Sequence, residues 1–363
     1  MGLSGKTRVL VVDDSALMRR VICNLLEEDP DLQVVGTAVD GYDAIHKIGE
    51  LSPDVVTLDL EMPRLDGLQT LGYLMSERPI PCIMLSAYTV SGAEATLKAL
   101  EYGAADFVQK PSGAISLNLD RVREELIEKV KIARYIDLKR LPFRDGVTPV
   151  LQAPSGAQAA AAAPAATKAA GAGVIKNLVA VGCSTGGPRA LAELVPGLPK
   201  GLKAPVLIVQ HMSAGFTKSL AERLDKDSEI HVKEAEEGEI LQPGTCYLAP
   251  GDWHMEVERK GFGGLIRLNQ RPPILGVRPS VDQLFLSVAE AFGDKAVGVL
   301  LTGMGRDGTK GMKAMKLKKS RTLAQDEASS VVYGMPRSAF NAGIVDRVVA
   351  LKDMAGAIVE SLA

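Results

Sequence analysis

The sequence predicts an α/β protein of two domains, each built on a doubly wound parallel sheet. Its 363 residues are too many for one ordinary core, because domains average about 150 residues. Short β-branched runs alternate with helical patterns in both halves, which is typical of βαβ units. Continuous apolar runs such as VLIV at 206–209 predict strands that are covered on both faces. An alanine-rich stretch separates the halves.

Composition excludes several classes of protein. The 42 basic and 44 acidic residues give a net charge of −2, which argues against a protein that coats nucleic acid. The four cysteines lie far apart without a CxxC pair, so a zinc site or a disulfide framework is not expected. The N-terminus lacks an apolar signal sequence, and no apolar run is long enough to insert into a membrane. We therefore expect a cytoplasmic protein.

The domain boundary is predicted from composition. Between 153 and 172, 12 of 20 residues are alanine, and the stretch has no large apolar side chain. Such a segment cannot bury enough surface to offset its loss of conformational entropy, which favours a flexible linker. The alternative is a helix, but Pro154 and Pro164 interrupt it. The predicted division is 6–125 for the first domain, 126–173 for a helix and linker, and 174–363 for the second domain.

The first domain has five strand candidates, followed in turn by polar residues. Because right-handed crossovers bring the carboxyl ends of parallel strands to one edge, we expect these residues to meet there. The clustered carboxylates would repel one another without a cation, and hard oxygen ligands at an open site favour Mg²⁺. With Mg²⁺ bound, one carboxylate could act as a nucleophile towards a phosphoryl group. A helix N-cap is the alternative for the acidic pair alone. The set comprises Asp13, Asp14, Asp59, Ser86 and Lys110.

The second domain begins with a strand, a glycine turn and a helix, at NLVAV, GCSTGGP and RALAELV. Three interpretations of the turn compete: a phosphate-binding loop, a purely structural turn, and a nucleophile elbow of the G-x-S-x-G type carrying Ser184. A serine nucleophile needs a base and an orienting acid. His211 follows the buried run PVLIVQ, and Asp307 follows KAVGVLL, so both belong to the same sheet edge. Further strands are expected in EIHVKEA and TCYLAPG.

The other candidates for catalysis in this domain receive a structural interpretation. His231 lies in EIHVKEA and His254 in a predicted loop, DWHMEVE, and both read as surface or satisfied histidines. Cys183 adjoins Ser184 where a small buried residue fits.

These motifs together resemble two known families. VVDDS (11–15), LDLEMPRLDG (58–67), the strand ending in Ser86 and KP (110–111) are similar to the response-regulator receiver domain. GCSTGGP, VQHM and LLTGMGRDG closely resemble the chemotaxis protein-glutamate methylesterases of the CheB type, as do RPSVDQLF and AQDEASSVVYGMPRSA. The resemblance implies a flavodoxin-like receiver followed by a Rossmann-like methylesterase domain.

The methylesterase resemblance implies hydrolysis of glutamate methyl esters on the cytoplasmic helices of chemoreceptors, with release of methanol. Deamidation of receptor glutamines is implied as a second activity. Ser184 is then the nucleophile, His211 the base and Asp307 its orienting acid, with no metal in this domain. Backbone amides near Thr185 or Met304 are expected to bind the oxyanion.

The receiver resemblance implies that Asp59 accepts a phosphoryl group from a chemotaxis histidine kinase. Asp13, Asp14 and Asp59 then bind Mg²⁺, and Ser86 and Lys110 sense the phosphate. Phosphorylation is expected to relieve a receiver docked over the catalytic cleft. The alternative is a phosphorylation-controlled binding module without hydrolytic activity.

Overall fold

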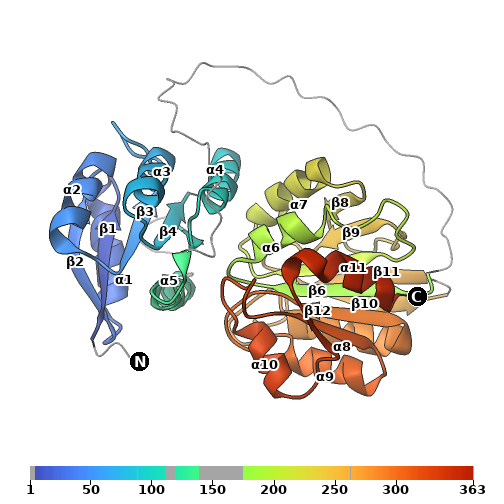
Figure 1. Ribbon diagram of the computed structural model, residues 1–363. Coiled ribbons are helices and arrows are strands. Elements are labelled where there is room, and N and C mark those ends of the chain that lie inside the picture. The colour runs from blue at the N-terminus through green and yellow to red at the C-terminus, as the bar shows by residue number, and fades with distance from the viewer. Residues whose placement is uncertain (1–4, 88, 112–118, 139–174, 262, 363) are drawn as a thin grey trace, which may run out of the picture.

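In the computed structural model of this protein, the described residues are 5–87, 89–111, 119–138, 175–261 and 263–362. Two parallel sheets form the centres of two α/β units (Figure 1). The predicted fold class is confirmed. The alanine-rich segment at 153–172 lies outside the described residues. No helix within these ranges is long and apolar enough to cross a membrane.

The first unit is a five-stranded parallel sheet in the order β2-β1-β3-β4-β5. Strand β1 pairs with β2 on one side and with β3 on the other. The order in which strands are added to the sheet therefore reverses between β1 and β3. The elements are β1 (Thr7–Val12), α1 (Ala16–Glu27), β2 (Leu32–Ala38), α2 (Gly41–Leu51), β3 (Val55–Asp59), α3 (Gly67–Glu77), β4 (Cys82–Ser86), α4 (Val90–Glu101), β5 (Asp106–Gln109) and α5 (Leu119–Ala133).

The helix predicted within 126–173 corresponds to α5, which begins earlier and spans Leu119–Ala133. It packs inward at Leu126, Val130 and Ala133, which are buried with residues of β1, β3 and β4. The boundary predicted at residue 125 falls inside this helix. Division of the chain at that residue stays a prediction.

The second unit is a seven-stranded sheet in the order β14-β13-β12-β6-β7-β9-β8, with every pair parallel. Its elements begin with β6 (Leu178–Cys183), α6 (Gly187–Leu194), β7 (Val206–Gln210), α7 (Phe216–Asp227), β8 (His231–Glu234), β9 (Thr245–Leu248), β10 (His254–Lys260) and β11 (Gly263–Asn269). They continue with α8 (Val281–Phe292), the 3₁₀ turn η2 (Gly293–Lys295), β12 (Ala296–Leu300), α9 (Thr309–Leu317), β13 (Arg321–Gln325), α10 (Met335–Asn341), β14 (Arg347–Val349) and α11 (Leu351–Ser361).

Two layers cover this sheet (Figure 1). Helices α6, α7 and α11 pack on one face through residues such as Leu191, Leu220 and Ile358. Helices α8 and α9 pack on the other face, together with the antiparallel hairpin β10–β11. The sequence interpretation of DWHMEVE as a loop is wrong from His254 onward, because His254 begins β10 and is fully buried.

The order of the strands determines where a ligand can bind. From β6 the chain moves to β7 on one side, and it later returns to place β12 on the other side of β6. Helices leave a crevice at such a reversal, outside the carboxyl ends of the strands. The residues that follow β6, β7 and β12 therefore share one edge of the sheet.

Candidate functional site

Ser184 stands on a tight turn directly after β6. Its backbone N–H donates to Thr302 (3.0 Å), and its carbonyl accepts from Gly187 (2.7 Å). Two glycines are required here for different reasons. Gly186 has φ +77°, and a Cβ on Gly187 would lie 1.8 Å from Oε1 of Gln210. The turn thus places the Ser184 side chain at the sheet edge, ahead of α6.

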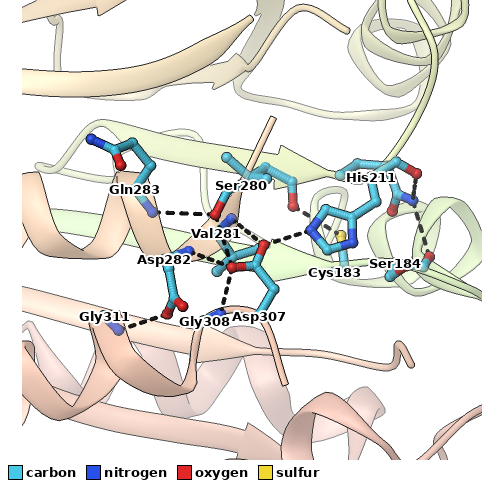
Figure 2. Close-up of polar contacts among 12 residues, drawn as sticks. Cys183, Ser184, His211, Ser280, Val281, Asp282, Gln283, Asp307, Gly308 and Gly311 are labelled. Atoms are coloured by element: carbon cyan, nitrogen blue, oxygen red, sulfur yellow. Dashed lines mark hydrogen bonds and ion pairs between the residues drawn. The ribbon is translucent and has the colours of Figure 1, made fainter. Parts of the chain in front are cut away.

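His211 follows β7 and faces Asp307, which follows β12. His211 Nε2 and Asp307 Oδ2 are 2.8 Å apart, and both side chains are largely buried (Figure 2). An ionised carboxylate only accepts hydrogen bonds, so Nε2 carries the hydrogen and Nδ1 is left as the basic nitrogen. The structure therefore brings together two of the three residues predicted as a triad.

Asp307 is held as an anion by an unusual supply of donors. Oδ1 accepts from the Ser280 hydroxyl (2.8 Å) and from the backbone N–H groups of Asp282 (2.9 Å) and Gly308 (3.0 Å). Oδ2 accepts from the Val281 N–H (2.7 Å) in addition to His211. Burial by itself would raise the pKa of Asp307, but the bonds from His211 and the backbone lower it below its ordinary value. The N-terminus of α8 thus stabilises the charge (Figure 2).

Ser184, His211 and Asp307 line one cavity of about 460 Å³. No hydrogen bond joins the Ser184 hydroxyl to His211 among the described residues, although both lie on the same side of the site (Figure 2). The buried Gln210 links them from behind, because its amide donates to the carbonyls of Ser184 and His211, at 3.0 Å each. Catalytic hydrogen bonds are often long in proteins without substrate, so this geometry is compatible with a nucleophile and its base.

The two predicted oxyanion donors line the same cavity. Thr185 is buried and directs its hydroxyl away, to Asp106 of the first unit (2.7 Å). Met304 is partly exposed at the rim. Cys183 is fully buried, and burial raises the pKa of its thiol well above the ordinary value, so it cannot compete with Ser184.

The predicted carboxylate cluster forms at the edge of the first sheet. One oxygen from each of Asp13, Asp14 and Asp59 lies within 4.8 Å of the others. Asp13 and Asp59 are buried, whereas Asp14 is exposed, so the cluster opens to solvent on one side. Three hard oxygen donors around an open position fit a small divalent cation.

Lys110 supplies the nearest positive charge, with Nζ 2.7 Å from both Asp13 and Asp59. Burial would lower the pKa of Lys110, but these two bonds raise it. Burial raises the pKa of Asp59 to about 6, with a further contribution from Asp13 that Lys110 does not fully offset. Ser86 ends β4 and is buried, and its hydroxyl donates to the carbonyl of Gly92 (3.2 Å). Among the described residues, the only ion pairs of the three carboxylates are those with Lys110, so a bound cation would balance the remaining negative charge.

The first unit closes one side of the cavity that Ser184, His211 and Asp307 line. The rings of Phe107 and Phe216 lie 4.7 Å apart between their centres, and Arg121 pairs with Asp252 (3.1 Å). Glu128 lies in the cavity wall, where burial raises its pKa despite nearby Lys129 and His211. Helix α5 provides most of this wall, through Arg121, Glu124, Glu125, Glu128, Lys129 and Ile132.

The sequence did not predict that Gln210 and Ser280 contribute to the site, and it indicated no contact between His254 and the site. The run Ser-Val-Asp-Gln at 280–283 carries a helix-start pattern, and Ser280 does cap α8. No pattern in the sequence connects that cap with Asp307. His254 is a satisfied histidine, as expected, but a buried one: Nδ1 accepts from the Ser280 N–H, and Nε2 contacts the Pro272 carbonyl.

Comparison with known proteins identifies both halves. Residues 9–119 match the response regulator receiver domain, and residues 179–358 match the family described as CheB methylesterase. The protein-glutamate methylesterase/protein-glutamine glutaminase of Pyrococcus abyssi is 45% identical, over 100% of this chain and 95% of its own length. Its namesake in Halalkalibacterium halodurans is 48% identical, covering 98% and 99%. The crystal structure of the Thermotoga maritima CheB methylesterase catalytic domain is 43% identical, with a TM-score of 0.51, and covers 52% of this chain and 99% of its own.

Proposed function

Because this chain belongs to the CheB methylesterase family and begins with a response regulator receiver domain, we propose that it hydrolyses glutamate methyl esters on chemoreceptors under the control of phosphorylation. The observation that carries the proposal is the buried Asp307–His211 pair, which shares one cavity with Ser184 at the carboxyl ends of β6, β7 and β12. A binding module would have no use for an oriented imidazole beside a serine.

In the first chemical step, Ser184 Oγ attacks the ester carbonyl while His211 Nδ1 takes its proton. The C–O bond to the methoxy group then breaks, and the same proton leaves with methanol. Water hydrolyses the resulting acyl-serine by the reverse sequence, which releases the glutamate carboxylate and restores Ser184. Throughout, Asp307 holds the imidazole with Nε2–H towards itself and stabilises the imidazolium that forms.

The negative oxygen of the tetrahedral intermediate needs donors that are already in place. Thr185 and Met304 both line the cavity, and the backbone N–H of neither donates to another residue in the part of the chain that the structure describes. We assign them to the oxyanion. The same acyl transfer with ammonia as the leaving group would convert a receptor glutamine to glutamate.

In the receiver domain, Asp59 would accept a phosphoryl group from a chemotaxis histidine kinase. The side chains of Asp13, Asp14 and Asp59 would hold Mg²⁺, which would neutralise charge on the phosphoryl oxygens. Lys110 already contacts both buried carboxylates and could pair with the phosphate. Ser86 would have to release the Gly92 carbonyl to reach it, and that exchange would alter the start of α4. A substrate and a kinase of these kinds would act with the protein in the cytoplasm.

Phosphorylation would act by displacing the receiver from the catalytic cavity. Thr185, adjacent to the nucleophile, donates to Asp106 at the start of β5, and α5 walls the cavity. In this arrangement α5 would hinder the entry of a receptor helix. Repacking of β5 and α4 around a phosphorylated Asp59 would weaken the docked state and open the cavity.

Methanol release from methylated receptors, measured with acetyl phosphate and Mg²⁺, tests the proposal. Wild-type protein should release methanol, and Ser184→Ala should not. Ser213→Ala is the matched control, because Ser213 lines the same cavity without joining the triad, and it should retain activity. A fluorophosphonate probe should label the wild type and not Ser184→Ala. An unlabelled, inactive wild type would instead support the binding module.

A further inference from the structure

We propose that Ser280 and His254 are positioning residues for the reaction, and that they set the orientation of Asp307 and hence of the imidazole of His211. The inference rests on the proposed hydrolytic function. It concerns a series of hydrogen bonds that runs from His254 in β10, through Ser280 at the N-cap of α8, to Asp307. The positions of Ser280 and His254 in the sequence do not predict this series.

The Ser280 hydroxyl makes the contact with Asp307 in this series of hydrogen bonds. Ser280 is fully buried at the N-cap of α8, with Oγ 2.8 Å from Asp307 Oδ1 and 3.5 Å from the N–H of Gln283. A hydroxyl has one hydrogen, which goes to the carboxylate, and a lone pair remains to accept from Gln283. One side chain thus caps the helix and holds the acid (Figure 2).

Ser280 differs in kind from the other donors to Asp307. The N–H groups of Val281, Asp282 and Gly308 belong to the backbone and persist in any substitution at their positions except proline. Among the described residues, the Ser280 hydroxyl is the only side-chain donor to Oδ1. With Oδ1 saturated in this way, Oδ2 is presented to His211.

His254 makes the contact with Ser280 in this series of hydrogen bonds, and it is fully buried at the start of β10. Its Nδ1 accepts the backbone N–H of Ser280 (3.2 Å), and its Nε2 lies 3.2 Å from the carbonyl of Pro272. These partners require a neutral ring with hydrogen on Nε2 only. Protonated Nδ1 would oppose the Ser280 N–H, so a charged His254 would push the cap away from Asp307.

The surroundings of His254 keep it neutral. Burial is the main cause that lowers its pKa, and the nearby positive charge of Arg278 acts in the same direction. The Pro272 carbonyl and the carboxylates of Asp307 and Glu256 act in the opposite direction and do not reverse the shift. The lowered pKa favours the neutral ring, whose Nδ1 accepts from the N–H of Ser280.

Loss of the Ser280 hydroxyl has a consequence that loss of stability alone would not have. A carboxylate that accepts fewer hydrogen bonds has a more concentrated negative charge, so it attracts the imidazolium proton more strongly. We expect kcat to fall about tenfold, as for loss of one hydrogen bond to a charged group, and the acid limb of kcat/KM to move to higher pH.

The test uses the full chain, activated with acetyl phosphate and Mg²⁺, on receptor membranes carrying labelled methyl groups. Ser280→Ala and Ser280→Gly both remove the hydroxyl, but glycine is tolerated at an N-cap and preserves the fold if alanine does not. Both should show the lower kcat and the shifted acid limb. Ser280→Thr keeps a hydroxyl and should restore both. Ser287→Ala is the control, since that hydroxyl also ties α8 to β10 without touching Asp307.

His254 is tested by two amides that each keep half of its contacts. Asparagine places an oxygen where Nδ1 accepts from Ser280, whereas glutamine places its amide where Nε2 meets Pro272. If His254 acts through Ser280, His254→Asn retains more kcat than His254→Gln at equal thermal stability. The opposite order would show that His254 only anchors the Pro272 loop.

A measurement that does not depend on activity separates this inference from the proposed function. The proton shared by His211 and Asp307 should give a downfield NMR resonance, which moves in Ser280→Ala and Ser280→Gly but not in Ser287→Ala. If the resonance and the acid limb of kcat/KM are unchanged in the Ser280 variants while the wild type still demethylates receptors, the positioning role is wrong. If the wild type releases no methanol but the resonance moves in the Ser280 variants as expected, the hydrolytic function would be overturned instead.

Discussion

Asp59 and Asp307 both lie at the carboxyl edge of a parallel sheet, Asp59 as the last residue of β3 and Asp307 in the loop after β12, but their surroundings differ. Each is almost fully buried near the carboxyl end of a strand beside the point where the strand order reverses. Asp59 receives one long backbone bond, from Glu61 (3.4 Å), and an ion pair with Lys110, and burial raises its pKa to about 6. Asp307 receives three backbone N–H groups, a hydroxyl and His211, and its pKa is lowered.

The difference suits the two carboxylates to different chemistries. A carboxylate short of donors favours a cation and can present an oxygen to a phosphoryl group. A carboxylate surrounded by donors stays ionised, keeps its orientation and directs an imidazole. Local donors, and not the place in the sheet, decide which of the two a buried aspartate becomes.

The largest expected effect is at Asp307. Asp307→Asn keeps the size of the side chain but can turn its NH₂ group towards His211, which stabilises the wrong tautomer, so kcat should fall on the order of 10⁴-fold. Methanol release under activating conditions measures it. Asp282→Asn is the control, because its amide oxygen can still accept from Gly311 and the N–H to Asp307 remains. Similar losses in both variants would remove the special role of Asp307.

The corresponding change at Asp59 should leave catalysis intact. Asp59→Asn is expected to keep the basal rate of demethylation and to lose the rise that acetyl phosphate and Mg²⁺ produce in the wild type, about tenfold for a coupling of ordinary size. Glu61→Gln, a neighbouring change outside the carboxylate cluster, should still be activated. Activation of Asp59→Asn would mean that another residue accepts the phosphoryl group.

Separating the two regions tests whether they are coupled by docking. The fragment 174–363 lacks α5, which walls the cavity, and should be about tenfold faster than the unphosphorylated full chain. Such a ratio needs only about 1.4 kcal/mol between docked and open states. If the fragment is no faster, the receiver does not inhibit, and the result would support recruitment of the enzyme to its receptor by phosphorylation.

The smallest expected effect is that of Asp59→Asn on the free energy of unfolding, measured without a metal ion. The folded pKa of Asp59 lies above its ordinary value of 3.8, so its ionisation costs stability as the pH rises through about 6. Asp59→Asn should therefore raise the free energy of unfolding by about 1–3 kcal/mol at pH 8, with no gain below about pH 4. Calorimetry in EDTA measures this.

Asp307→Asn should act in the opposite direction. Its folded pKa is lowered, so the ionised form contributes stability above its ordinary value of 3.8, and that contribution is lost as the pH falls through the lower folded value. The variant should unfold more easily than the wild type at neutral pH. Changes of the same sign at both positions would contradict the contrast drawn between the two sites.

The sequence by itself determined which residues lie at the strand ends. β-branched runs specify buried parallel strands, and right-handed crossovers bring their carboxyl ends together, so Ser184, His211 and Asp307 could be grouped before any coordinates. The same rule grouped the carboxylates of the first domain. These features follow from local periodicity and chain direction, which a sequence records directly.

Only the tertiary structure decided what surrounds those residues. The Ser280 hydroxyl meets Asp307 across 27 positions of the chain, and Thr185 meets Asp106 across 79. His254, interpreted from sequence as a loop residue, is buried because the β10–β11 hairpin packs on α8. Such contacts depend on the angle at which one element packs on another, and no periodicity encodes that angle. The supply of donors that separates Asp307 from Asp59 is therefore a property of the packed fold.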